Sequence, residues 1–371
     1  MMDPRIERLA DTLVGFSTAV KAGDNVLISA TNDCEMLVTA LVRAVYRAGA
    51  TPFVWLNASA VERALAMGYT QAQLDLRAQT DAALMEQMQC YIGFSAIQNN
   101  FEMADVPAAN MNLYGKQYGK RVHTDLRVPK TRWCVLRYPT RAMAQMASMS
   151  TEQFEDFYFD VCTMDYSKME RAMQPLVDLM EKTDRVRIVG AGTDLSFSIK
   201  GMPAIPCAGR MNIPDGEVFT APVKDSVNGV ITYNTPSTLD GFRYEQVRLT
   251  FRDGAVIDAQ ANDTARIQEV FKRDAGARYV GEFAIGVNPF ITTPMDNTLF
   301  DEKIMGSFHF TPGSCYEECD NGNQSALHWD LVCIQTPAFG GGEMYFDDVL
   351  VRKDGRFVLE ELDALNPENL R

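Results

Sequence analysis

The sequence predicts an α/β N-terminal domain with a mostly parallel sheet, followed by an α+β, strand-rich second domain. Up to about residue 180, helical periodicity alternates with short all-apolar strands, a pattern typical of parallel sheets that are buried on both faces. From residue 185 onward, polar and apolar residues alternate between frequent turns, which indicates antiparallel strands. We therefore expect two domains, over residues 1–182 and 183–371, and the length of 371 residues accommodates both.

The composition is that of an ordinary globular protein, with 46% apolar and 23% charged residues. The formal net charge of −14 argues against binding to nucleic-acid phosphates or to an anionic membrane. No apolar run approaches the ~20 residues of a membrane span. The first residues are acidic where a secretory signal would be basic and then apolar, and the eight cysteines are scattered. We therefore expect a cytoplasmic protein with reduced thiols and a small partner molecule.

The first domain is expected to begin with alternating helices and strands. Apolar positions at helical spacing predict a helix over residues 4–22, followed by an apolar strand at residues 26–30. A second helix at residues 34–48 ends at Gly49 and leads into a strand at residues 52–56. Because the turn after the first strand lacks the glycines of a dinucleotide-binding fingerprint, we interpret this sheet as structural.

Further helices and strands complete the first domain. Residues 61–90 are helical by periodicity, and residues 90–94 and 133–138 are expected to be strands of the same sheet. Residues 141–182 are expected to form helices whose methionines fill gaps in the core. His123 lies in a polar, locally basic stretch between these strands, and nothing in its surroundings assigns a role to it.

The second domain is expected to consist mainly of strands. The first candidates lie at residues 185–190, 229–233, 245–251 and 255–259. Asp253-Gly254 between alternating runs is a strong hairpin signal, and a further hairpin is expected over residues 344–359. Residues 190–195 superficially resemble a phosphate loop, but alternating residues follow them, so we interpret them as a hairpin turn. One helix is expected near residues 262–275.

Two histidines and an aspartate point to a polar site in the second domain. A strand over residues 325–332 would place His328 and Asp330 on one face and Trp329 on the other. His309 lies upstream in a short apolar run and has no obvious structural role. Two of the three histidines in the chain therefore converge on one region.

Two carboxylates are candidates for the same site. Glu217 lies in the run 214–219 and Glu282 in the run 279–286, both strand-like and either apolar or flanked by glycine. A lone buried carboxylate is costly unless it is paired or bound to a cation. The residues alone leave two interpretations open, a shared metal site or separate hydrogen bonds that satisfy each group.

Counting the donors favours a pair of metal ions. The candidate ligands are Glu217, Glu282, His309, His328 and Asp330. Five ligands are too many for a zinc centre with three protein ligands, but they suit two divalent ions ~3.5–4 Å apart that share a carboxylate and a water. Such a pair lowers the pKa of the shared water towards neutrality. The mixture of nitrogen and oxygen donors suits Zn²⁺, Co²⁺ or Mn²⁺ better than Mg²⁺.

A tyrosine lies close to this ligand set in the sequence. Tyr316 follows His309 by seven residues, so its phenol could donate a hydrogen bond to the oxyanion of a tetrahedral intermediate. A tyrosine that is simply packed in the core is the open alternative. Cys315 and Cys319 have a spacing that could serve a metal, but no second pair of thiols supports this weaker hypothesis.

Several runs, taken together, resemble the metallo-aminopeptidases of the M29 family. The resemblance extends over nearly the whole chain and is strongest in the second domain. It is carried by residues 20–28, 47–50, 138–140, 192–195, 212–222, 281–286, 301–306 and 325–330. The combination of these runs is far more specific than any one of them.

The resemblance implies an exopeptidase with two metal ions that removes N-terminal residues from small peptides. The metal-ligand pattern of the family falls on Glu217, Glu282, His309, His328 and Asp330. Its active-site tyrosine falls on Tyr316, and we expect Glu282 and Tyr316 to be the catalytic residues. The strand-rich domain would then be the metal-binding domain. The family also implies a homodimer that encloses the site, with no nucleic acid or membrane as a partner.

Two departures from the family pattern concern the substrate. The segment 309–316 is less aliphatic than in the family, and the stretch from Tyr316 to His328 is short and acidic. The resemblance also extends to ring-cleaving dihydroxypyridine dioxygenases, in which His309, His328 and Asp330 would hold one Fe²⁺. Glu217 and Glu282 favour the peptidase because a single iron needs neither. A binding protein that has lost its catalytic activity is the third possibility.

Overall fold

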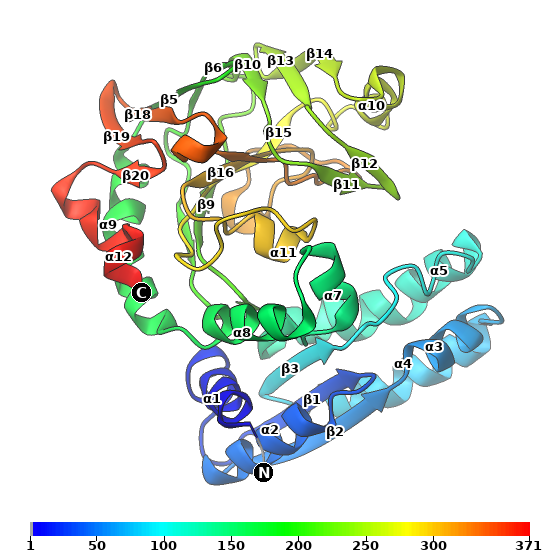
Figure 1. The fold of residues 1–371 in the computed structure, drawn as a ribbon. Coiled ribbons are helices and arrows are strands. Elements are labelled where there is room, and N and C mark those ends of the chain that lie inside the picture. The colour runs from blue at the N-terminus through cyan, green and yellow to red at the C-terminus, as the bar shows by residue number, and fades with distance from the viewer. Residues whose placement is uncertain (1–2) are drawn as a thin grey trace. The chain divides into compact units, whose positions relative to one another are not determined.

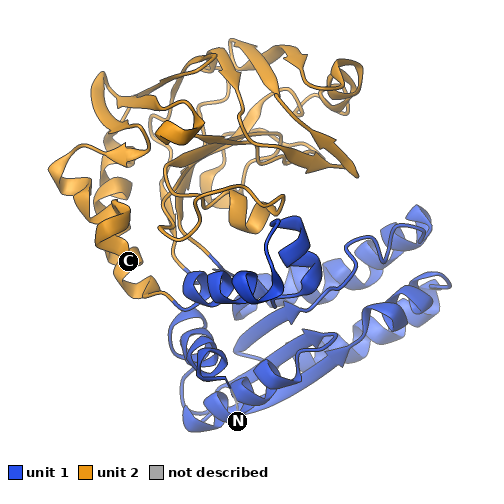
Figure 2. Cartoon of the chain, viewed as in Figure 1, with its two compact units in different colours: residues 1–163, 209–214 blue, residues 164–208, 215–371 orange. Residues whose placement is uncertain are grey.

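The computed structural model describes residues 3–371, which form two compact units (Figure 2). Unit 1 comprises residues 1–163 and 209–214, and unit 2 comprises residues 164–208 and 215–371. Unit 1 contains a parallel sheet with helices, and unit 2 is rich in antiparallel strands, which confirms the predicted fold class. The predicted division at residue 182 differs from these bounds, because the long helix α9 (Tyr166–Lys182) belongs to unit 2.

Unit 1 is built on a five-stranded sheet with the order β2-β1-β3-β4-β8, and all neighbouring strands are parallel. Figure 1 labels β1, β2 and β3 of this sheet. Its strands are β1 (Asn25–Thr31), β2 (Thr51–Asn57), β3 (Cys90–Ser95), β4 (Arg132–Arg137) and β8 (Asn212–Ile213). The first four strands match the predicted ones. The sequence gives no signal for β8, because a strand of two residues is too short to show a periodicity.

Helices cover this sheet. They are α1 (Pro4–Thr12), the π-helix η1 (Leu13–Ser17), α2 (Glu35–Arg47), α3 (Ser59–Ala66), α4 (Gln71–Met85), α5 (Ala108–Tyr114), the π-helix η2 (Gly115–Arg127), α6 (Val128–Lys130), α7 (Arg141–Met146) and α8 (Thr151–Cys162). In helix α4, the sequence explains where the helix begins and which face is buried. Thr70 caps its first turn by accepting a hydrogen bond from the Gln73 amide, and Leu74, Ala78 and Met85 form its buried stripe.

Unit 2 contains two larger sheets and a short ribbon. An antiparallel sheet of eight strands has the order β14-β13-β10-β6-β5-β18-β19-β20. These strands are β5 (Arg185–Gly190), β6 (Thr193–Ser198), β10 (Asn228–Thr232), β13 (Arg248–Arg252), β14 (Ala255–Gln260), β18 (Gly342–Phe346), β19 (Val349–Lys353) and β20 (Arg356–Phe357). The predicted hairpin turns are present, with Gly192 and Gly254 at positive φ angles of 68° and 81°.

The second large sheet of unit 2 has the order β17-β16-β15-β9-β7 and is also antiparallel. Its strands are β7 (Ile205–Cys207), β9 (Glu217–Thr220), β15 (Val280–Gly286), β16 (Ser307–Pro312) and β17 (Val332–Ile334), and the ribbon pairs β11 (Ser237–Leu239) with β12 (Phe242–Tyr244). The remaining helices are α10 (Thr264–Val270), α11 (Thr298–Asp301), η3 (Glu317–Cys319), η4 (Pro337–Phe339), η5 (Glu360–Leu365) and α12 (Pro367–Leu370).

The core of unit 2 lies between its two large sheets. Phe197 and Phe251 of the eight-stranded sheet contact Phe310 of the five-stranded sheet, with ring centroids 4.9 and 5.9 Å apart. Phe197 also contacts Phe283, with centroids 5.0 Å apart. The two sheets therefore form a sandwich, and the opposite face of the five-stranded sheet carries a separate buried cluster that includes Phe219, Ala284 and Cys319.

Two predicted elements differ from the structure. The predicted helix at residues 262–275 is only α10, because Asp274 caps a turn by accepting bonds from the Gly276 and Ala277 amides. The predicted strand at residues 325–332 is also wrong, because regular pairing begins only at Val332. No helix within residues 3–371 is long and apolar enough to cross a membrane.

Candidate metal centre

The register of the five-stranded sheet in unit 2 places three candidate ligands on one face. His309 in β16 pairs with Ala284 in β15, and Glu217 in β9 pairs with Gly286. Partners in an antiparallel pair share a face, and residues two apart in a strand do so as well. Glu282 is two residues from Ala284, so Glu217, Glu282 and His309 all lie on the same side.

Small residues make room for these side chains. Ala284 and Gly286 occupy the positions opposite His309 and Glu217, so that face of β15 carries no bulky side chain there. The alternate residues Phe283 and Ile285 are fully buried in the sandwich core. The strand is therefore apolar on one face and carries one acidic group on the other.

The last two candidate ligands come from the irregular segment that precedes β17. This segment follows β16 and is held there by bonds from the Ser314 amide to Leu327 O (2.7 Å) and from the Trp329 amide to Pro312 O (3.1 Å). The backbone remains extended, so side chains still alternate: Trp329 donates through Nε1 to Ser237 Oγ, while His328 and Asp330 turn the other way. The predicted separation of faces is present although the strand is not.

The five candidate ligands meet in unit 2 and form two groups. His309 Nε2 lies 3.6 Å from Glu217 Oε2 and 3.4 Å from Glu282 Oε1. His328 Nε2 lies 3.2 Å from both Glu282 Oε2 and Asp330 Oδ1. Each group of three has ligand atoms within 4.8 Å of one another, close enough to hold an ion. Glu282 contributes one oxygen to each group and is therefore the shared carboxylate.

Several atoms of this cluster lack the hydrogen bonds that burial demands. Glu217 Oε2 and His328 Nε2 are buried and make no hydrogen bond with any described residue. His328 Nδ1 lies 2.8 Å from Ser314 O, and because a carbonyl can only accept, Nδ1 carries a proton and Nε2 is the nitrogen that faces Glu282 and Asp330. Buried carboxylate and imidazole atoms without hydrogen bonds fit divalent cations, which would satisfy them.

A buried lysine is part of the cluster, although the sequence assigned no role to it. Lys303 Nζ lies within hydrogen-bond distance of Glu217 Oε1, 2.8 Å from Glu302 Oε1 and 3.6 Å from Asp215 Oδ1. Its side chain is 2% exposed. Glu302 itself forms a further potential metal group with His309 and Asp330. The only signal for Glu302 and Lys303 was their position in the run 301–306, which contributed to the family resemblance.

The two histidines are strongly basic in the metal-free protein. Burial lowers the pKa of His309, but the nearby carboxylates, Glu217 first among them, outweigh it and raise that pKa to about 10. Burial likewise opposes protonation of His328, yet Asp330 and Glu282 raise its pKa to about 11. Without metal, both imidazoles therefore carry protons that a bound cation would displace.

The pKa values of the carboxylates shift in different directions, depending on the residues beside each group. Burial raises the pKa of Glu217 to about 8 despite the charge of Lys303. Burial also acts on Glu282 and Asp330, but the histidines outweigh it and lower the pKa of each below its usual value. The pKa of Lys303 stays well above its usual value because its carboxylate neighbours outweigh burial. Glu282 and Asp330 are thus charged at neutral pH and ready to bind a cation.

Tyr316 lies next to this cluster. Its ring packs edge-on against His328, with centroids 4.9 Å apart, and its side chain is 47% exposed. Partial burial, followed by the charge of Glu282, raises the pKa of the phenol above its usual value, so the phenol keeps its proton. Cys315 and Cys319 belong to none of the potential metal groups in residues 3–371, and their thiols instead contact Asn323 O and Pro203 O.

A β-rich unit in which carboxylate and imidazole groups lie close together on one face of a sheet is typical of a metal-dependent hydrolase. The chain belongs to the M29 family of thermophilic metalloproteases, whose profile matches residues 2–357. It is also 32% identical over 158 residues to aminopeptidase AmpS of Bacillus subtilis strain 168. That match covers 38% of this chain and 37% of AmpS.

Two solved structures share the fold over almost the whole chain. Wild-type AmpT from Thermus thermophilus superposes with a TM-score of 0.79 at 20% identity, covering 97% of this chain and 100% of AmpT. The 2,5-dihydroxypyridine dioxygenase from Pseudomonas putida KT2440 superposes with a TM-score of 0.62 at 15% identity, covering 96% and 98% of the two chains. At these identities the likeness concerns the fold alone.

Proposed function

We propose that this metalloprotease is an aminopeptidase that uses two divalent cations to hydrolyse N-terminal residues from small peptides. The observation that carries the proposal is the shared carboxylate Glu282, which lies between two groups of potential ligands. The charges agree: five carboxylates and one ammonium leave four negative charges, which two divalent cations would balance. These groups are Asp215, Glu217, Glu282, Glu302, Asp330 and Lys303.

The residues of the chain have separate tasks in this proposal. Glu217 and His309 would hold one cation, His328 and Asp330 the other, and Glu282 both. Ser314 O fixes the tautomer of His328, and Thr311 Oγ1 donates to Asp330 Oδ1 at 2.9 Å, which orients that carboxylate. Zn²⁺, Co²⁺ or Mn²⁺ suits this set of nitrogen and oxygen donors.

The chemistry that such cations supply is activation of a water molecule and polarisation of the scissile carbonyl. The protein contributes the donor that follows from its own geometry. The protonated phenol of Tyr316 has no hydrogen bond to any described residue and packs against His328, so it is free to donate to the oxygen of the reacting carbonyl. Glu282 would fix the spacing of the two ions, which makes Glu282 and Tyr316 the proposed catalytic residues.

The resemblance to the family extends the proposal to the environment of the enzyme. We propose a cytoplasmic homodimer that acts on small peptides. The net charge of −14 supports the absence of nucleic acid and anionic membranes among its partners.

Metal content and turnover test the proposal together. Protein purified without chelators should contain two divalent ions per chain and should release nitroaniline from aminoacyl-nitroanilides. Glu282→Gln removes a charge from both groups and should lower kcat/KM by about 10³-fold or more, comparable to the loss of a principal electrostatic catalyst. Glu361→Gln, at an exposed site of the same unit, is the matched control and should leave both quantities unchanged.

The alternative is a ring-cleaving dioxygenase with one Fe²⁺ on His309, His328 and Asp330. The fold that this chain shares with the dihydroxypyridine dioxygenase is the reason to consider this alternative. The position of Glu217 and Glu282 beside the same histidines argues against it. One iron per chain, oxygen consumption with a dihydroxypyridine and no peptide hydrolysis would reverse our assignment.

A further inference from the structure

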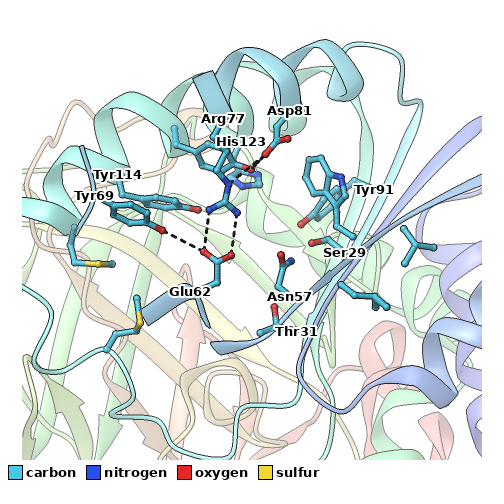
Figure 3. Close-up of a pocket in the computed structure, with 16 residues that line it drawn as sticks. Ser29, Thr31, Asn57, Glu62, Tyr69, Arg77, Asp81, Tyr91, Tyr114 and His123 are labelled. Carbon is cyan, nitrogen blue, oxygen red and sulfur yellow. Dashed lines mark hydrogen bonds and ion pairs between the residues drawn. The ribbon is translucent and has the colours of Figure 1, made fainter. Parts of the chain in front are cut away.

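Unit 1 contains a cavity of about 550 Å³, within the usual range for small-molecule sites, that is lined entirely by residues of this unit (Figure 3). We call it the β1–β2 cavity, because it lies over the carboxyl halves of β1 and β2. In parallel α/β sheets, ligands bind beyond the carboxyl ends of the strands, near the point where the strand order reverses. Here β1 lies between β2 and β3, so the order of the strands reverses beside β1.

The sequence creates this cavity by placing small residues in the sheet. Leu27, Phe53 and Tyr91 are in register across three strands and fill one level of the sheet face. Two residues further along, Ser29 is in register with Trp55 on one side and Gly93 on the other, and the Tyr91 ring lies over Gly93. The small side chain of Ser29 between these rings leaves room towards the strand ends, and residues of α4 and η2 form the opposite wall.

The aromatic wall of the cavity is a stack of tyrosines. The rings of Tyr69 and Tyr114 are stacked, with centroids 5.7 Å apart, and Tyr114 and Tyr118 follow with centroids 5.1 Å apart. The guanidinium of Arg77 lies over the Tyr118 ring at 4.8 Å. Faces of tyrosine rings attract cations, and the protein already uses one of them in this way.

The charged side chains that line the cavity carry one more negative than positive charge, because the carboxylates of Glu62 and Asp81 face the single guanidinium of Arg77. Asp81 also accepts a hydrogen bond from the Tyr118 hydroxyl at 2.8 Å. Arg77 bonds to both oxygens of Glu62, at 3.1 and 3.3 Å, and its Nε lies 3.7 Å from Asp81 (Figure 3). One guanidinium therefore serves two carboxylates. The imidazole in the lining, His123, is neutral because burial lowers its pKa to about 4.

Neutral polar groups complete the lining. Ser29, Thr31, Asn57 and Tyr91 point their side chains towards the cavity, and none of these side chains makes a hydrogen bond with another residue in the described part of the chain (Figure 3). These groups both donate and accept. A bound molecule with a hydroxyl or amide would therefore find partners at this end of the cavity.

We propose that the β1–β2 cavity binds a small organic cation, an ammonium ion that also carries a hydrogen-bonding group. Its charge would lie against the carboxylates of Glu62 and Asp81, beside the Tyr69 ring at the end of the tyrosine stack. Its polar group would lie against Ser29 and Asn57. An anion is disfavoured because the guanidinium of Arg77 is shared by two carboxylates, while that of Arg127 covers the Tyr91 ring and does not line the cavity. A metal ion is disfavoured as well, since none of the potential metal groups in residues 3–371 lies here.

The test compares cations with neutral molecules of the same shape. Choline is paired with 3,3-dimethylbutan-1-ol, and 4-aminobutan-1-ol with butane-1,4-diol, in calorimetric titrations of the full-length protein. At least one cation should bind at least about tenfold more tightly than its neutral partner, a difference of about 1.4 kcal/mol. If neither cation is preferred over its neutral partner, the proposal is wrong.

Variants locate the site. Glu62→Gln should weaken binding of the preferred cation by about tenfold and leave the weak binding of its neutral partner unchanged. Glu86→Gln, at an exposed position after α4, is the matched control. Binding that survives Glu62→Gln unchanged contradicts the proposed site.

A measurement on the unchanged protein covers the case in which Glu62→Gln fails to fold. The preferred cation should slow hydrogen exchange in α4 and η2, whereas its neutral partner should not. Slowed exchange confined to unit 2 would overturn the assignment to this cavity. Because binding is read directly, the result does not depend on peptidase activity.

Discussion

Lys303 is the residue on which the proposed metal centre depends most for its charge balance. Its ammonium contacts Glu217, Glu302 and Asp215 at the bottom of the site, where almost no solvent reaches. A fixed cation in this position lets several carboxylates lie close together before any metal arrives. It also occupies Oε1 of Glu217 and leaves Oε2 as the oxygen available to a metal ion.

Replacing Lys303 should therefore destabilise the protein strongly. Lys303→Met leaves buried carboxylates without a counter-charge and should lower the unfolding free energy by about 3–5 kcal/mol, measured by urea denaturation. Lys272→Met removes a surface ammonium paired with Glu269 and should cost about 0.5 kcal/mol or less. Equal losses in the two variants would show that Lys303 is not structurally important.

The raised pKa values of His309 and His328 predict how metal affinity depends on pH. Folding of the metal-free protein raises them from 6.5 to about 10 and 11. Their stabilising contribution is thus complete below pH 6.5 and is lost as the pH rises towards 10 and above. Glu217 acts in the same direction, because its pKa rises from 4.5 to about 8.

Metal binding should displace these protons and become stronger with pH. Between about pH 6 and about pH 8 the apparent affinity for zinc should rise about tenfold per pH unit for each proton released. Competition with a chelator measures the affinity, and calorimetry in buffers of different ionisation enthalpy counts the protons. An affinity that does not change over this range would contradict the protonation states described above.

Strand β15 is the element that positions the shared carboxylate, and it is held very closely by the chain beside it. A Cβ atom on Gly281 would lie 2.2 Å from Ser314 O and 2.6 Å from Gly313 O. A Cβ on Gly313 would lie 2.1 Å from Leu327 O. The backbones beside Glu282 and His328 are therefore each packed against residues 313–314 without room for a methyl group.

Gly281→Ala tests this close packing. The added methyl would force β15 away from residues 313–314, so we expect a loss of about 3 kcal/mol or more in unfolding free energy, together with weaker metal binding. Gly68→Ala is the matched control, because a Cβ added there would have nothing within 4 Å and the φ of Gly68 is not positive. It should change stability by about 1 kcal/mol or less. A mild effect of Gly281→Ala on both quantities would mean that the backbone yields there easily.

The whole molecule separates its tasks between two units with their own cores. All residues of the proposed metal centre lie in unit 2, and all residues of the β1–β2 cavity lie in unit 1. A ligand stabilises the part of a protein to which it binds. Metal should therefore protect the sheet of unit 2 that carries the ligands more than the parallel sheet of unit 1.

Removal of metal tests this separation. After treatment with a chelator, β15 and β16 should exchange their amide hydrogens faster, while β1 and β3 should change little. Readdition of zinc or cobalt should restore the protection. Hydrogen exchange followed by mass spectrometry measures both sheets in one experiment, and equal changes in β1 and β15 would contradict local stabilisation.

The sequence reveals the parts of this fold that follow from local pattern. Apolar runs predict β1 to β4, and Asp253-Gly254 predicts its hairpin, because strand burial and turn geometry depend on neighbouring residues. The five candidate ligands could be named from their unusual settings. Their roles remain a prediction, whereas their proximity within unit 2 is now observed.

Other features depend on contacts between distant residues and could not be predicted. Lys303 contacts Glu217, which is 86 positions away in the chain, and no local sequence pattern predicts such a pair. The segment before β17 alternates like a strand, but its pairing is irregular next to Gly313. The β1–β2 cavity depends on the alignment of Ser29 with residues of two neighbouring strands, Trp55 and Gly93, so His123 could not be assigned to it from sequence.

The proposed double use of Glu282 would affect how such an enzyme is activated. A carboxylate that serves two ions would make their affinities interdependent. The first bound ion would orient the carboxylate for the second ion, but its positive charge would also repel the second ion. Loading would then proceed in two unequal steps instead of one. When metal is scarce, the ratio of the two binding constants decides how the ions are distributed. Either some molecules would hold two ions and the others none, or most molecules would hold one ion.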